Sequence, residues 1–299
     1  MDRLRGKTNS SPKAPLPMDF TPPDSAPNIA SIRDEKLLKD ADAIVYKRTE
    51  QGDLTLHCFY PEGHTPDDSR SAVICFHGGQ WDQSMISQLV PQALNFVFLG
   101  AVGIVVEYRV STPYLTTPLE SISDAQSAIL WARQNNRTLG IDPKKIVALG
   151  AGSGAHIALC SAMLKKVEHD ASYSAKPNAL ILFSAIVDTT KRGIGMELFA
   201  NKRDARRSSP SKNIRRKLPP MLFFHGNEDP IVPVASVEKF CQRLSSKSNT
   251  ARFVPFARAT HSFFNFNVNQ QHFVQSLDSA EGFLTNLGFL TSGKEETIS

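Results

Sequence analysis

Four short segments place glycine, hydroxyl, carboxyl or imidazole groups directly after apolar runs that predict buried strands. They read HGGQW at residues 77–81, GAGSGAH at 150–156, HGNEDP at 225–230 and THSFFN at 260–265. In open sheets of parallel strands, ligands bind at the carboxyl ends of the strands, where these segments would meet. A hydroxyl, an imidazole and a carboxylate that meet there have the chemistry of a nucleophile, its general base and the group that orients the base.

The segment 150–156 predicts a sharp turn from a strand into a helix. A turn that presents a nucleophile is crowded, so it needs small residues two positions before and after its centre. Glycines at 150 and 154 meet this demand for a turn centred on Gly152, and alanines at 151 and 155 meet it for a turn centred on Ser153. Only the second register supplies a hydroxyl, so Ser153 is the candidate nucleophile.

Two further candidates follow Ser153 along the chain, an acid and then a histidine. Asp229 follows the predicted strand 221–224, and His261 follows the predicted strand 252–255. Nucleophile, acid, histidine is the chain order of triads built on this arrangement of strands and helices. We therefore expect Asp229 to orient His261, and His261 to act as general base and then as general acid.

The segment 77–81 has two successive glycines, Gly78 and Gly79, after an apolar strand. Glycines let the backbone approach a ligand closely, and their N–H groups can bind a developing oxyanion. His77 and Trp81 at the two ends of the segment are candidates for the wall of a substrate pocket. For Trp81 the alternative is a place over the core.

Together these segments resemble the acetyl-xylan-esterase and hormone-sensitive-lipase-like (BD-FAE-like) branch of the α/β hydrolases. The resemblance runs from about Val45 to Leu290 and rests on FHGGQW, EYRV, GIDPKKIVALGAGSGAHIA, VDTT, LPPMLFFHGNEDPIVP and THSFFN. It implies an α/β-hydrolase fold with a mostly parallel central sheet of about eight strands flanked by helices. It also implies hydrolysis of carboxylic esters of small acyl groups, often acetyl groups on carbohydrates, without a metal or an organic cofactor. The oxyanion hole would be formed by Gly78, Gly79 and the residue after the candidate nucleophile, Gly154.

The turn departs from the pattern of these esterases at one position. Aligned without gaps from Asp142 to His156, the family serine falls on Gly152, and the alanine that follows it falls on Ser153. Successive residues that enter a helix are rotated by about 100°. A hydroxyl on Ser153 would therefore point away from His261 unless the turn slips by one residue, and Gly152 marks the family nucleophile position.

Three interpretations of function fit these residues. The first is an active serine esterase that uses the three candidates above. The second is a catalytically impaired relative that binds an acyl or sugar ligand, or a protein partner, because loss of the nucleophile leaves only residual catalysis. The third is a dinucleotide-binding protein, since the glycine pattern of 150–155 also fits that fingerprint, with Glu168 and Asp170 near the distance for a ribose contact.

Short apolar runs alternate with amphipathic segments, which predicts a mainly parallel sheet covered by helices. Strands are expected at 43–46, 54–60, 72–76, 102–107, 146–149, 179–183, 221–224 and 252–255, with the first two antiparallel. Helices are expected at about 84–99, 124–134, 153–166, 234–244 and 274–287.

The two ends of the 299-residue chain differ in composition from the region between them. Residues 1–38 hold six prolines and are expected to form a disordered or loosely packed extension. Residues 39–290 are expected to form one α/β-hydrolase domain, and residues 291–299 a flexible tail. Within the domain, a short basic excursion at about 189–217 has ten Lys or Arg and two acidic residues. We expect a solvated loop there, because no aromatic interleaving or nucleic-acid-binding motif accompanies the charge.

Composition also bears on compartment and partners. Four scattered cysteines fit neither a disulfide framework nor a metal site. No apolar run approaches the roughly 20 residues of a membrane-spanning helix, and no apolar region follows the basic residues near the start of the chain as it would in a secretory signal. We expect a cytoplasmic protein whose partner is a small-molecule ester rather than nucleic acid. The sequence leaves the oligomeric state open.

Overall fold

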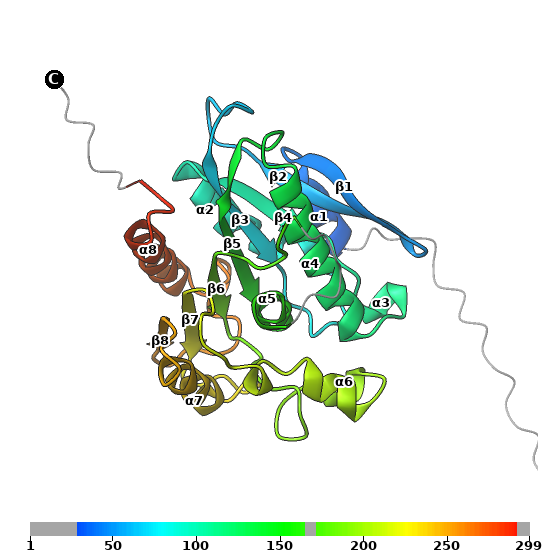
Figure 1. Ribbon diagram of the computed structural model, residues 1–299, viewed down its shortest axis with the longest axis vertical. Coiled ribbons are helices and arrows are strands. Elements are labelled where there is room, and N and C mark those ends of the chain that lie inside the picture. Colours follow the sequence, from blue (N-terminus) through cyan, green and yellow to red (C-terminus); the bar gives the residue numbers. More distant parts are fainter. Residues whose placement is uncertain (1–28, 165–171, 292–299) are drawn as a thin grey trace, which may run out of the picture.

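The structure, a computed structural model, describes residues 29–164 and 172–291, and its centre is a sheet with helices on both faces (Figure 1). Within these residues the sheet has eight strands in the order β1-β2-β4-β3-β5-β6-β7-β8. Strand β2 pairs antiparallel with both β1 and β4, and all other neighbours pair parallel. The predicted fold class, a mostly parallel sheet flanked by helices, is confirmed.

The strands are β1 (Asp42–Thr49), β2 (Gly52–Phe59), β3 (Arg70–Phe76), β4 (Val102–Val106), β5 (Ile141–Ala151), β6 (Ala179–Phe183), β7 (Met221–Gly226) and β8 (Ala251–Phe256). The α-helices are α1 (Ile29–Leu38), α2 (Val90–Phe98), α3 (Ser111–Tyr114), α4 (Pro118–Gln134), α5 (Ser153–Met163), α6 (Lys202–Arg207), α7 (Val234–Ser245) and α8 (Gln270–Asn286). Three short 3-10 helices are η1 (Ile86–Leu89), η2 (Met196–Leu198) and η3 (Pro210–Lys212).

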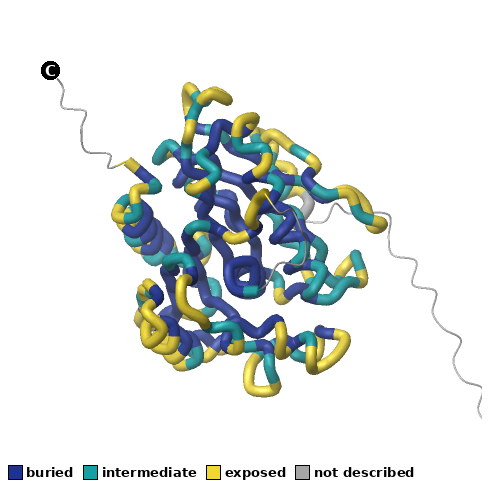
Figure 2. The backbone as a smooth tube through the Cα atoms, in the orientation of Figure 1, coloured by how far each residue is buried: buried dark blue, intermediate teal, exposed yellow. Residues whose placement is uncertain are grey.

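The central strands are buried on both faces, which explains their continuous apolar runs. Alternate residues of β3 enter different cores: Ile74 packs into the core under α4, α5 and α7, and Val73 and Cys75 pack into the core under α2 and α8. Figure 2 shows this buried centre in dark blue, with exposed loops around it. Full burial of an aliphatic or aromatic side chain contributes about 1.5–3 kcal/mol relative to exposure. The carboxyl ends of β3, β5, β7 and β8 are thereby held in register at one edge.

Several predicted helices differ from the observed ones for local reasons. The expected helix 84–99 is divided into η1 and α2, and Pro91 stands in the first turn of α2. Helix α4 begins six residues earlier than expected, because Thr117 and Glu120 form a capping box at its start. Helix α5 ends at Met163, and residues 165–166 of the predicted helix lie outside the described residues.

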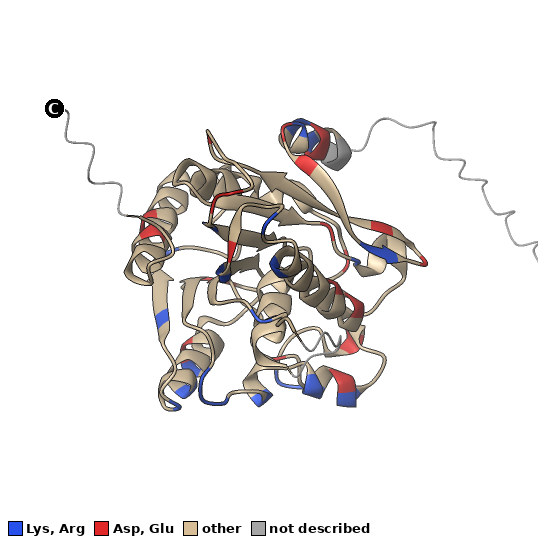
Figure 3. Ribbon diagram, turned by 45° about the horizontal axis from the view of Figure 1, so that its top comes forward, with Lys and Arg blue, Asp and Glu red and all other residues tan. Residues whose placement is uncertain are grey.

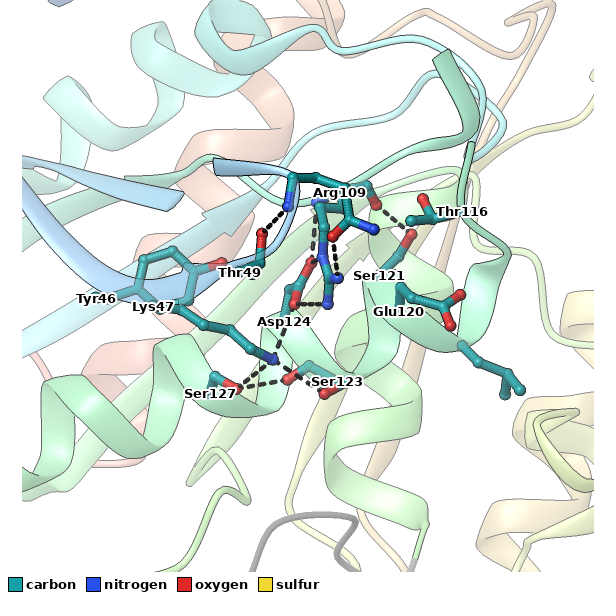
Figure 4. A network of polar contacts seen from close by, with 12 residues as sticks. Tyr46, Lys47, Thr49, Arg109, Thr116, Glu120, Ser121, Ser123, Asp124 and Ser127 are labelled. Carbon is teal, nitrogen blue, oxygen red and sulfur yellow. Dashed lines mark hydrogen bonds and ion pairs between the residues drawn. The ribbon is translucent and has the colours of Figure 1, made fainter. Parts of the chain in front are cut away.

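A buried ion network ties the segment after β4 to α4 and β1 (Figure 4). The side chain of Asp124 is fully buried, and the guanidinium of Arg109 donates to both of its carboxylate oxygens, at 2.8 and 2.9 Å. The ammonium of Lys47 lies 3.0 Å from the same carboxylate. The residue before Arg109 is Tyr108, whose hydroxyl donates to the backbone oxygen of His77 at 2.7 Å. The network therefore supports the glycine loop that begins at His77.

The basic excursion at 189–217 folds into η2, α6 and η3, and its Lys and Arg residues gather at the bottom of Figure 3. Thr189 Oγ1 donates to the backbone oxygen of Ala205 at 2.7 Å, and Ser209 Oγ donates to Asp188 Oδ1 at 3.0 Å. The excursion is thus anchored on the domain, while its cationic side chains are exposed.

The predicted extension 1–38 overlaps the described residues only at 29–38, which form α1. Residues 1–28 and 292–299 lie outside the described residues, so the predicted extension and tail stay predictions there. Among the described helices, none combines the length and the apolar character that a bilayer crossing requires.

Candidate active site

The turn between β5 and α5 is centred on Gly152. Its φ of +53° and ψ of −113° lie in a region that residues with a Cβ adopt only under strain. A Cβ atom built on Gly152 would lie 3.3 Å from His261 Nε2 and 3.8 Å from His261 Cε1. Position 152 therefore faces the imidazole, as the family nucleophile position should.

The flanking glycines fix this register. A Cβ built on Gly150 would come within 2.5 Å of the backbone oxygen of Gly154, and one built on Gly154 within 2.0 Å of the backbone oxygen of Phe76. No side chain fits at those distances, so the two glycines are required by the close approach of the backbone. The crowded turn is the one centred on Gly152, and the alanines at 151 and 155 do not define it.

Ser153, the predicted nucleophile, is the first residue of α5 and points elsewhere. It is buried, and its hydroxyl forms no hydrogen bond to any described residue. Burial raises the pKa of the Tyr108 phenol, and the neighbouring Ser153 hydroxyl opposes part of that rise. The two groups are close together but do not have the geometry of a hydrogen bond. The structure therefore brings Gly152, rather than the Ser153 hydroxyl, to His261.

The predicted acid and base do meet. His261 Nδ1 lies 2.8 Å from Asp229 Oδ2, and Asp229 Oδ1 accepts the backbone N–H groups of Ile231 and Val232, both at 2.9 Å. Burial alone would raise the pKa of Asp229, but the hydrogen bonds from His261, Val232 and Ile231 outweigh it and hold that pKa below its usual value. The ionised carboxylate accepts from Nδ1–H, which leaves Nε2 as the basic nitrogen that faces Gly152.

A second histidine, His225, lies beside the same carboxylate. His225 Nε2 donates to the backbone oxygen of Val232 at 2.8 Å and lies 3.3 Å from Asp229 Oδ2. Burial lowers the pKa of His225, so it stays neutral beside the carboxylate.

The loop that carries His261 is held by aromatic packing. Phe263 and Phe264 are buried, with the Phe264 ring 5.0 Å from that of Phe183 and the Phe263 ring 4.7 Å from that of Phe256. The hydroxyl of Ser184 donates to the backbone oxygen of His261 at 2.7 Å. These contacts place the imidazole over the end of β5.

A cavity of about 370 Å³ opens in front of Gly152 and His261. Its apolar wall comes from Met85, Ile231 and Phe264. The remaining lining residues are polar or small: Gly78, Gly79, Gln80, Asp82, Gln83, Gln88, Ala151, Ser262 and Asn265. The cavity is therefore suited to a small ligand with one apolar and one polar end.

Of the three oxyanion-hole candidates, two line the cavity and one does not. Gly78 and Gly79 line the cavity, but the Gly78 N–H donates to the side-chain oxygen of Gln88 at 2.6 Å. In a turn centred on Gly152, the residue that follows is Ser153 and not Gly154. The third candidate donor is therefore the Ser153 N–H and not the Gly154 N–H, in the first turn of α5 where N–H groups lack helical partners.

Neither predicted pocket-wall residue lines this cavity. His77 is buried and stacks on Tyr108 at 4.3 Å, and burial lowers the pKa of His77 to about 4. Trp81 is buried with its ring edge-on to His156 at 5.0 Å, which places it over the core. For Trp81 this is the second of the two places that the sequence left open. His77 borders the glycine pair, but the chain turns its side chain inward. Conversely, Gln88 and Ser184 carry no motif that would have singled them out in the sequence.

The described residues give little support to a metal site or a dinucleotide site. Among residues 29–164 and 172–291, no group of three or more His, Cys, Asp or Glu side chains could hold a metal ion. For a dinucleotide, the start of α5 would have to receive a pyrophosphate, yet Gly154 is packed against the end of β3. Glu168 and Asp170, the candidates for a ribose contact, lie outside the described residues.

Comparison with known proteins agrees with this fold. The chain is similar to esterase 2 of Thermogutta terrifontis: its propionate-bound structure is 34% identical, with a TM-score of 0.80 and coverage of 85% of this chain and 97% of that one. It is also similar to esterase LipC of Mycobacterium tuberculosis, 25% identical over 66% of this chain and 54% of that protein. Endo-1,4-beta-xylanase B of Butyrivibrio fibrisolvens is 26% identical over 66% of this chain.

The chain spans only 33% of that xylanase and about half of LipC. The BD-FAE family profile matches residues 56–244, which is more than half of the chain. That match includes the glycine loop, the turn at Gly152 and the acid Asp229. The chain belongs to the BD-FAE family, in the esterase branch of the α/β hydrolases.

Proposed function

We propose that the protein hydrolyses carboxylic esters of small acyl groups, with Asp229 and His261 activating a water molecule beside Gly152. The observation that carries this proposal is the 3.3 Å between His261 Nε2 and the Cβ position of Gly152, with Nδ1 2.8 Å from Asp229. A water molecule bound at that position with the substrate gives a proton to Nε2 while its oxygen attacks the acyl carbon. His261 then passes the proton to the leaving alkoxide, so that ester and water become carboxylic acid and alcohol.

The cavity supports a short acyl group and a polar alcohol. Its apolar wall suits an acyl chain of a few carbons, and its polar residues suit a polyhydroxy alcohol such as a carbohydrate. Structures of the Thermogutta esterase hold propionate or butyrate, and one relative is a xylanase. We propose acylated carbohydrates as the substrate class.

The proposed mechanism predicts slow turnover. General base catalysis contributes about 10²–10⁴ in rate, whereas a serine at the turn would add covalent catalysis. Gly152→Ser should therefore raise hydrolysis of a short activated ester by at least about 100-fold. His261→Ala in the wild-type background should lower hydrolysis by about 10²–10⁴. Rates with p-nitrophenyl acetate measure both changes.

Ser153 supplies the control. Because its backbone N–H and not its hydroxyl has the proposed role, Ser153→Ala should leave the wild-type rate within about threefold, as expected for a conservative change. A fluorophosphonate probe should label the serine introduced at position 152 and leave the wild-type protein unlabelled. Labelling of Ser153 in the wild type would instead establish the serine mechanism with Ser153, Asp229 and His261.

A second candidate function is ligand binding without turnover. It is favoured by the engagement of the Gly78 N–H with Gln88, which removes one oxyanion donor. If wild type and His261→Ala hydrolyse esters equally slowly while an ester analogue still binds, this function replaces the first.

We also propose a cytoplasmic location, with no role in nucleic-acid binding. The four cysteines are free and buried among the described residues, as is common where thiols stay reduced.

A further inference from the structure

A glutamine side chain occupies the end of the cavity where an oxyanion would be stabilised. The backbone N–H of Gly78 donates to Gln88 Oε1 at 2.6 Å, which is shorter than the usual 2.9–3.0 Å for such bonds. Gln88 lines the same cavity as Gly152 and His261. The Gly78 N–H has one proton to donate, and an amide oxygen is a stronger acceptor than an ester carbonyl oxygen, so the Gln88 amide competes with a substrate carbonyl for this N–H.

The backbone of Gln88 is fixed, while its side chain can rotate. Gln88 belongs to η1, where its N–H donates to the backbone oxygen of Met85 at 2.9 Å. The preceding residue, Ser87, is held by α1: its N–H donates to Asp34 Oδ1 at 3.3 Å, and its hydroxyl accepts from Arg33 Nε at 3.0 Å. Movement of the amide away from Gly78 therefore requires only side-chain torsions.

We propose that Gln88 determines the substrate specificity of this site by competing with the acyl carbonyl for the Gly78 N–H. The inference rests on the proposed function in taking position 152 as the point of attack. To bind, a substrate must displace the Gln88 amide, which then needs a new hydrogen-bond partner. A polyhydroxy alcohol supplies that partner within the cavity, and an alkyl alcohol does not. Gln88 thus selects esters of polar alcohols over alkyl esters.

The Gly152→Ser variant gives a readout that does not depend on wild-type turnover. In that background, the rate of labelling by a small alkyl fluorophosphonate reports access of a phosphoryl oxygen to the oxyanion donors. Gln88→Ala should raise this rate by about 3–10-fold, the worth of one competing hydrogen bond. Gln88→Met, which keeps the length of the side chain but has no amide, should do the same even if alanine disturbs packing.

Two further variants complete the test. Gln88→Glu should lower the labelling rate, because a carboxylate binds the N–H more strongly and repels the developing negative charge. Gln275→Ala, a change at an exposed glutamine of α8 that does not line the cavity, should leave the rate unchanged. The selectivity follows from kcat/KM values: Gln88→Ala should raise kcat/KM for ethyl acetate more than for an acetylated sugar.

The outcomes separate the inference from the proposed function. Absence of labelling at position 152 in Gly152→Ser would contradict the proposed function. Labelling that Gln88→Ala and Gln88→Met leave unchanged, or lower, would overturn the inference and assign Gln88 to support of the glycine loop.

Discussion

At the scale of single residues, the chemistry of this site depends on the hydroxymethyl group that Gly152 lacks. The Gly152 backbone keeps the strained turn, and the two glycines around it leave no room for another register. His261 keeps its orientation because Asp229 is held by two N–H groups as well as by the imidazole. The candidate base and its candidate acid thus lie beside a position that has no nucleophilic side chain.

The Asp229 carboxylate gives a prediction of pH dependence. Its pKa is held below the usual 3.8 in the folded protein, so its ionised form stabilises the fold. That stabilisation is present above pH 3.8 and is lost as the pH falls through the lower folded-state pKa. Asp229→Asn should therefore cost about 1–3 kcal/mol in the free energy of unfolding near pH 7 and progressively less below pH 4.

Urea unfolding at several pH values measures this difference. Asp278→Asn on the exposed side of α8 is the matched control and should change little at any pH. A cost for Asp229→Asn that stays constant down to pH 2 would show that the carboxylate charge has no part in it.

At the scale of secondary-structure elements, a buried ion network outside the cavity supports the site. Arg109 and Lys47 share the buried carboxylate of Asp124 (Figure 4), which joins β1, the segment after β4, and α4. Through Tyr108 the same segment supports the backbone of His77, at the start of the glycine loop. A change in the packing of α4 would therefore alter the position of the glycine loop.

Removal of the shared carboxylate tests this connection. Asp124→Ala removes the buried carboxylate that Arg109 and Lys47 share, and removal of one partner from a buried ion pair typically costs about 3–5 kcal/mol. Asp53→Ala, which breaks the exposed pair with Arg48 at 4.0 Å, should cost less than about 1 kcal/mol. Chemical denaturation measures both. Equal losses for the two variants would mean that the network does not carry the stability assigned to it.

At the scale of the whole molecule, the beginning of the described chain is connected to the cavity. Helix α1 contacts η1 through Arg33, Asp34 and Ser87, and η1 carries Gln88. Asp34 and Ser87, which lie 53 positions apart in the sequence, are thus in contact directly before Gln88, a residue of the cavity wall.

Loosening of α1 should change access to the cavity. In the Gly152→Ser background, Asp34→Ala should raise fluorophosphonate labelling by about two- to fivefold, because loss of the contact with the Ser87 N–H lets the backbone of η1 shift and weakens the bond from Gly78 to Gln88. Asp40→Ala, which removes only an exposed pair with Lys39 at 3.9 Å, should have no effect. Equal labelling rates for the Asp34→Ala variant and its parent would place α1 outside the control of the site.

Much of this protein was predictable from local sequence. The alternation of short apolar runs with amphipathic segments predicted all eight strands, and the segments after them placed Asp229 and His261 close together, because parallel strands end at the same edge. Helix starts were less predictable. Helix α4 begins earlier than expected because of the capping box at Thr117, and α2 begins later because Pro91 stands in its first turn. Residues 29–38 follow a proline-rich stretch, from which we expected no helix. Helix α1 forms there and contacts η1.

The sequence by itself determined the fold class, the candidates for acid and base, and the presence of a one-residue ambiguity at the turn. Only the tertiary structure decided the register, because it depends on backbone oxygens of Phe76 and Gly154 that come from separate segments. The same holds for Gln88, which meets Gly78 across ten residues of chain, and for Trp81, which turns into the core. Periodicity and motifs encode which elements form, whereas the contact of one loop with another depends on how those elements pack.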